Sequence, residues 1–88
     1  MKPLNYAILK YFTNVSEASL KELMEFLKED YAKFKAFNKH SLSNALMTAE
    51  ANGLIEEVDF DLDENGELLI YYKANEDSKQ TINSFIKD

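Results

Sequence analysis

Residues 58–72 constrain the fold most, because apolar and polar side chains alternate there on both sides of a glycine turn. A period of two along the chain is typical of β-strands that bury one face. The apolar positions are Val58, Phe60 and Leu62 before the turn and Leu68, Ile70 and Tyr72 after it. The segment therefore predicts a β-hairpin.

The length of the connecting loop fixes the register of this hairpin. A three-residue loop, 64–66, with a left-handed Gly66 pairs Leu62 with Leu68. A two-residue turn would instead pair Leu62 with Leu69 and place the second apolar set beside the acids. Because a slip of one residue exchanges the two faces, burial of the apolar side chains favours the three-residue loop.

The opposite face of the hairpin is expected to be acidic. The alternation points a row of three aspartates outward, two glutamates lie at the tip, and Tyr71 and Leu69 fall on the acidic side. Those two are expected either to pack under the last helix or to form a patch for a partner. The acidic positions are Asp59, Asp61, Asp63, Glu64 and Glu67.

Four amphipathic helices are expected around this hairpin. Ser19 and Glu22 fit a capping box, Asn38 is a good N-cap, and Gly53 is suited to a left-handed C-terminal stop. Val15, between the first two helices, is expected to form a minimal strand. The helices are expected at about 3–13, 19–31, 38–52 and 76–87.

The order of these elements resembles the winged helix-turn-helix superfamily. Residues 41–46, Ser-Leu-Ser-Asn-Ala-Leu, followed by Gly53-Leu54-Ile55, resemble that superfamily's recognition helix running into its wing. The resemblance implies a single α+β domain over 1–88, with a three-helix core, a β-hairpin wing and an additional C-terminal helix within 74–88. The link 32–37 is longer than the tight turn of the superfamily.

The resemblance also implies that the exposed face of helix 38–52 enters the major groove of DNA, as in a transcriptional regulator. Residues 31–49 contain three lysines, one histidine and no acid, and lysine neutralises phosphate while asparagine reads adenine. The positions that match the DNA-binding face are Lys33, Lys35, Lys39, His40, Ser43, Asn44 and Met47.

The charge of the second half supports an alternative. Residues 50–88 hold eleven acids and three lysines, and all ten basic residues of the chain are lysines. A carboxylate 4 Å from a phosphate is repelled by about 1 kcal/mol even in bulk water. The alternative is therefore a protein-interaction module, an adaptor or an inhibitor, that binds a basic protein through Asp59, Asp61, Asp63, Glu64, Glu67 and Tyr71.

Several functional classes are disfavoured. The chain has no cysteine and a single histidine, His40, so thiol catalysis, zinc-thiolate sites and a catalytic triad are not expected, and neither is a cofactor. Residues 61–66 match the first half of a calcium loop, but Tyr72 occupies the position of the required bidentate glutamate. We expect a non-enzymatic protein without a metal.

The sequence also predicts where the protein is located and how it assembles. The chain has no apolar run long enough for a membrane span, and its composition suits the cytoplasm of a bacterium or its phage. Ile82, Phe85 and Ile86 form a short apolar stripe on the last helix. We expect this stripe to be buried at least partly across a homodimer, although docking on the first helix would cover the same residues.

Overall fold

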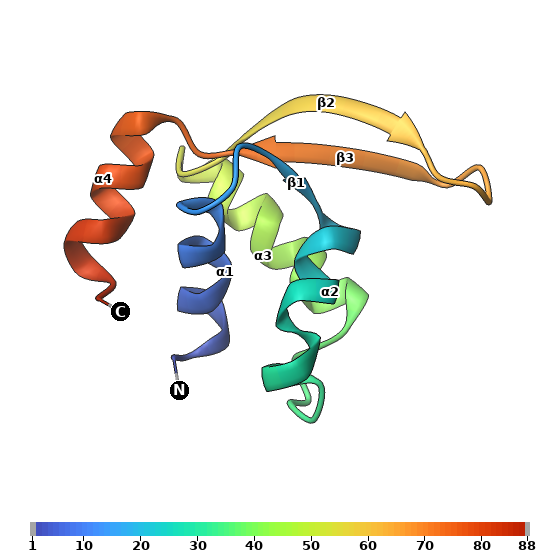
Figure 1. Ribbon diagram of the computed structural model, residues 1–88, viewed down its shortest axis with the longest axis horizontal. Coiled ribbons are helices and arrows are strands. Elements are labelled where there is room, and N and C mark those ends of the chain that lie inside the picture. The colour runs from blue at the N-terminus through green and yellow to red at the C-terminus, as the bar shows by residue number, and fades with distance from the viewer. Residues whose placement is uncertain (1, 88) are drawn as a thin grey trace.

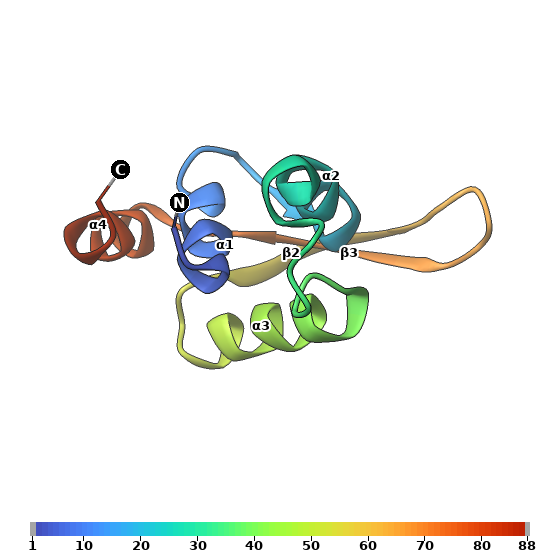
Figure 2. The ribbon, with the colours of Figure 1, turned by 90° about the horizontal axis from the view of Figure 1, so that it is seen from below.

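The computed structural model describes residues 2–87 and shows an α+β fold (Figure 1). Three helices lie on one face of a small antiparallel sheet, and a fourth helix lies at the side of the first (Figure 1 and Figure 2). In chain order the elements are α1 (Leu4–Phe12), β1 (Ala18–Ser19), α2 (Leu20–Tyr31), α3 (Lys39–Ala51), β2 (Glu56–Leu62), β3 (Leu68–Lys73) and α4 (Glu76–Phe85).

The predicted helix boundaries are explained by local chemistry. The Ser19 hydroxyl accepts the Glu22 N–H, and the Glu22 carboxylate accepts the Ser19 N–H, which confirms the capping box of α2. The Asn38 side chain accepts the Ser41 N–H at 2.8 Å and so caps α3. Gly53 has φ +76°, a left-handed conformation, and its N–H donates to the Glu50 carbonyl.

The sheet has the order β1-β3-β2, so β2 forms one of its edges. Phe60 pairs with Ile70 and Leu62 with Leu68, and Gly66 has φ +80°. The three-residue loop and its register are therefore confirmed. A register shift between Glu57 and Asp59 was not expected.

The prediction that Val15 forms the short first strand is wrong. It consists of Ala18 and Ser19 rather than Val15, and it pairs with Tyr72 and Tyr71 of β3. Ala18 is completely buried in the core, a position that a small side chain can occupy.

The core lies between the helices, α4 included, and the inner half of the sheet. It is built mainly from aliphatic and aromatic side chains, namely Ile8, Tyr11, Phe12, Ala18, Leu23, Leu27, Tyr31, Leu42, Leu46, Ala49, Ile55, Tyr72, Ala74, Ile82 and Ile86. The outer half of the hairpin extends beyond the helices (Figure 1). As a result, the apolar face of the hairpin is not buried along its whole length, contrary to the prediction.

The C-terminal helix is part of the core rather than an appendage. Ile82 and Ile86 are buried, whereas Phe85 is half exposed. The Lys10 ammonium on α1 donates to the Asn83 side chain and to the Ile86 carbonyl. The apolar stripe is thus largely covered within one chain, and Phe85 is the member of the stripe that stays exposed. No helix among residues 2–87 is long and apolar enough to cross a membrane.

Candidate nucleic-acid interface and hairpin surface

The outer side of α3 carries most of the side chains predicted to contact DNA. Leu42, Leu46 and Ala49 bury one side of the helix. On the opposite side of the helix Lys39, His40, Asn44 and Met47 are exposed, and Ser43 is partly buried. The structure brings these five residues together on one helix.

Lys33 and Lys35 lie in the link that leads into α3, and both are exposed. This long link is a series of turns in which the Phe34 N–H donates to the Tyr31 carbonyl and the Phe37 N–H to the Phe34 carbonyl. The Asn38 side chain also donates to the Lys35 carbonyl at 3.1 Å. The link is therefore held against the helix that follows it.

Two polar residues on α3 contact each other. Asn44 Nδ2 and His40 Nε2 lie 3.3 Å apart, as expected for positions i and i+4 on one helix face. Both would have to exchange this contact for a base edge in order to read DNA.

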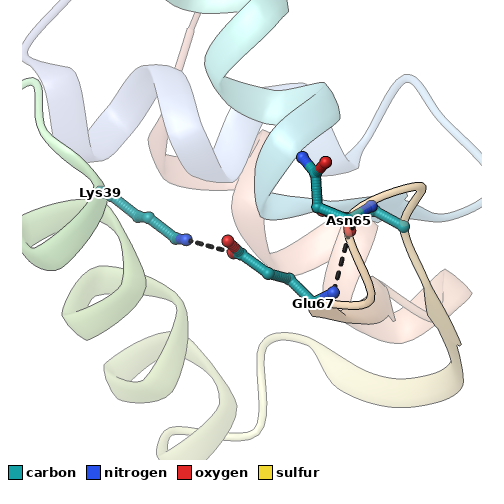
Figure 3. Close-up of polar contacts among 4 residues, drawn as sticks. Lys39, Asn65 and Glu67 are labelled. Carbon is teal, nitrogen blue, oxygen red and sulfur yellow. Dashed lines mark hydrogen bonds and ion pairs between the residues drawn. The ribbon is translucent and has the colours of Figure 1, made fainter.

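Lys39 contacts the tip of the hairpin. Its Nζ lies 3.3 Å from the Glu67 carboxylate, as Figure 3 shows. Both side chains are largely exposed, at 73% and 63% of their surface, so the ion pair contributes only about 0.2–1 kcal/mol. Sequence reasoning had assigned the two residues to different surfaces and did not foresee the contact, because they are 28 positions apart.

The two faces of the hairpin differ in chemistry. Tyr72 is buried against the helices and Ile70 packs on the core, so the alternation places Phe60 and Leu62 on this inner face and Asp59 and Asp61 on the outer one. Beyond the helices the inner face is uncovered. The exposed fractions there are 73% for Phe60, 62% for Leu62 and 59% for Leu68.

Tyr71 lies on the acidic outer face, as expected, and is partly buried there. Burial raises the pKa of its hydroxyl above the ordinary value, and the carboxylates of Glu22, Asp61, Glu17 and Asp59 raise it further. The outer face is therefore electrostatically negative around Tyr71.

Asp63 has a structural role in the hairpin turn. Its Oδ1 accepts the N–H of Asn65 at 2.8 Å and the N–H of Glu67 at 2.9 Å, and Figure 3 shows this turn. These bonds, above all the one from Glu67, lower the pKa of the Asp63 carboxyl. Glu64 is exposed at the tip. Among residues 2–87 no cluster of three or more histidines and carboxylates is arranged to hold a metal.

A groove that sequence reasoning missed lies between α2, the start of α3 and β3. Its volume is about 510 Å³. It is lined by apolar side chains with lysines and acids at its rim, and these residues are Leu20, Lys21, Met24, Glu25, Lys28, Ala32, Phe37, Lys39, Asp63, Glu67, Leu68, Leu69 and Ile70. Lys39 and Glu67 both belong to this rim, so the groove adjoins the α3 surface.

Comparison of the sequence with protein-family models gives no match, and comparison with curated proteins gives no significant match either.

Proposed function

We propose that this chain is a winged helix-turn-helix protein that binds double-stranded DNA through α3 and acts as a transcriptional regulator. The observation that carries the proposal is the outer side of α3, where Lys39, His40, Asn44 and Met47 are exposed in a stretch of the chain without acids. Lysine can neutralise phosphates at the start of the helix, and asparagine can pair with an adenine edge.

The arrangement of elements supports the same proposal. Three helices, a short strand before the second helix, and a hairpin after the third are the order found in winged-helix proteins, and the sheet order β1-β3-β2 is compatible with it. Asp59 and Asp61 lie on the face of the hairpin opposite the helices, so neither acid is on the face that α3 covers.

The proposal is tested by retention of fragments of the native genome at about 50 mM salt, where the electrostatic contribution to DNA binding is strong. A retained fragment should bind Lys39→Ala more weakly than wild type, with a salt slope smaller by about one. Lys79→Ala on α4 is the matched control, since it removes the same charge far from α3 in the sequence. Absence of any retained fragment would contradict the proposal.

Specificity gives a second readout. Asn44→Ala should cost roughly 1–3 kcal/mol on the preferred site and much less on unrelated duplexes, because base contacts carry sequence information. An equal loss on both kinds of duplex would assign Asn44 to general backbone contact instead.

The second candidate function is the protein-interaction module, and the exposed apolar side chains of the hairpin favour it. Phe60 and Leu62 are more exposed than is usual for such residues, and acids flank them. Replacing Asp59 and Asp61 together by asparagine separates the candidates. A DNA-binding protein should keep or gain DNA affinity, whereas a module that binds basic partners should lose capture of its partner.

A further inference from the structure

The free edge of β2 combines unpaired backbone with an exposed apolar row. β2 pairs only with β3 among the described residues, and every one of its seven residues is exposed. An open edge strand presents backbone N–H and C=O groups to which another strand can add.

The register shows which backbone groups face this open edge. The Asp63 N–H donates to the Glu67 carbonyl at 2.8 Å, so the backbone of Asp63 faces β3. Backbone direction alternates along an antiparallel strand, and Asp61 and Asp59 therefore also face β3. Phe60 and Leu62 direct their N–H and C=O groups outward.

These two outward amides are covered by the side chains that precede them. The Phe60 N–H donates to Asp59 Oδ1, and the Leu62 N–H donates to Asp61 Oδ1, both at 2.8 Å. An incoming strand must displace these carboxylates before it can pair with the edge. A lysine or arginine on that strand would then compensate each released carboxylate, whereas a neutral strand would not.

A second copy of the chain is a poor occupant of the edge. In an antiparallel pairing of two β2 strands, the aspartates of both copies would lie on the same face, and like charges opposite each other are destabilising. Both pairs of carboxylate caps would also be lost without a cation to replace them. The charge of the edge therefore selects a basic partner.

We propose that the free edge of β2 binds an extended peptide segment in which apolar residues alternate with lysine or arginine, by addition of a fourth strand to the sheet. The apolar side chains of the segment would lie beside Phe60 and Leu62, and its cations beside Asp59 and Asp61. This surface is separate from the outer side of α3, so the inference goes beyond the proposed DNA binding, and it gives the second candidate, the protein-interaction module, a defined partner and binding mode.

The test uses the full chain and a soluble eight-residue peptide that alternates lysine with valine. Two control peptides have the same length: one segregates the same lysines and valines into two blocks, and one alternates glutamate with valine. Binding is measured by fluorescence anisotropy, and amide hydrogen exchange is measured by NMR. At about ten times the dissociation constant, exchange at Phe60 and Leu62 should slow about tenfold with the alternating lysine peptide only.

Variants separate strand addition from simple charge attraction. Leu62→Pro removes an outward N–H while leaving the β2–β3 ladder intact, because proline is tolerated at a strand edge. It should abolish binding, whereas Leu62→Val should retain it. Replacing Asp59 and Asp61 by asparagine should weaken binding roughly three- to tenfold. Lys39→Ala should leave peptide binding unchanged, so that failure here is distinguishable from failure of DNA binding.

Three results would overturn the inference. They are equal binding of the segregated peptide, unchanged amide exchange at Phe60 and Leu62, and protection of these amides by duplex DNA instead of the peptide. If Leu62→Pro does not fold, as judged by circular dichroism, strand addition is accepted or rejected from the amide exchange of Phe60 and Leu62 in the wild-type chain.

Discussion

The ion pair between Lys39 and Glu67 should compete with DNA for the lysine that begins α3. If Lys39 contacts a phosphate in the complex, the pair seen in the free protein must open first. Glu67→Gln removes the competing carboxylate while keeping the size of the side chain. We therefore expect this substitution to raise DNA affinity.

The size of the gain follows from the geometry. In the Glu67→Gln variant there is no ion pair to open before DNA binds, which increases the binding free energy by about 0.2–1 kcal/mol for a pair this exposed. Removing a carboxylate near the duplex adds at most about 1 kcal/mol at 4 Å, and less at longer distances or in salt. The two contributions together give a gain of about 0.2–2 kcal/mol, which corresponds to an increase in affinity between about 1.4-fold and 30-fold.

Fluorescence anisotropy with a retained genomic duplex, between about 50 and 200 mM salt, measures this gain. Glu64→Gln is the matched control, because it removes a charge from the same hairpin tip without breaking the pair with Lys39. In a Lys39→Ala background the effect of Glu67→Gln should shrink, since the lysine it releases is absent. A gain no larger than that of Glu64→Gln, or a loss of affinity, would refute a role for Lys39 at the duplex.

Three further predictions concern stability. Ile82→Ala should destabilise the chain by about 2–5 kcal/mol in urea unfolding, while Phe85→Ala on the same helix should cost under about 1 kcal/mol, because only Ile82 is fully buried; equal costs would show that α4 is not docked. NMR titration of the Asp63 carboxyl should give a pKa below the ordinary aspartate value, and the stability it contributes, present at neutral pH, should be lost as the pH falls through that lowered pKa. Calcium at about 1 mM should leave the thermal midpoint unchanged, and a rise reversed by EDTA would contradict this.

The features that were predicted correctly from the sequence depend on interactions between near neighbours in the chain. The capping box at Ser19, the cap at Asn38, the left-handed Gly53 and the hairpin loop each involve residues within a few positions of one another. Whereas the choice of the hairpin loop also used the burial of one face, the caps and the left-handed glycine are fixed by local hydrogen bonds and sterics. The same holds for the side of α3 that faces outward, since helical spacing determines it.

The features that were missed depend on how elements far apart in the sequence are arranged in space. Periodicity distinguishes the two faces of the hairpin, but it does not show how far the strands extend past the helices. Phe60 and Leu62 were therefore expected to be buried, although both are largely exposed. The burial argument nevertheless selected the correct register, because Ile70 and Tyr72 at the inner end of the same face do pack on the core.

The three aspartates of the hairpin show why a regular pattern does not imply a shared role. Asp59 and Asp61 accept the outward amides of the residues that follow them, whereas Asp63 accepts two amides within the turn. All three carboxylates thus satisfy backbone donors, and their repetition in sequence is explained without a ligand. The three aspartates differ in whether their hydrogen bonds can be given up without disrupting the hairpin. Asp63 holds the loop closed, while Asp59 and Asp61 cover amides that pair with no strand within residues 2–87. Only these two could therefore exchange their bonds for a partner without opening the hairpin.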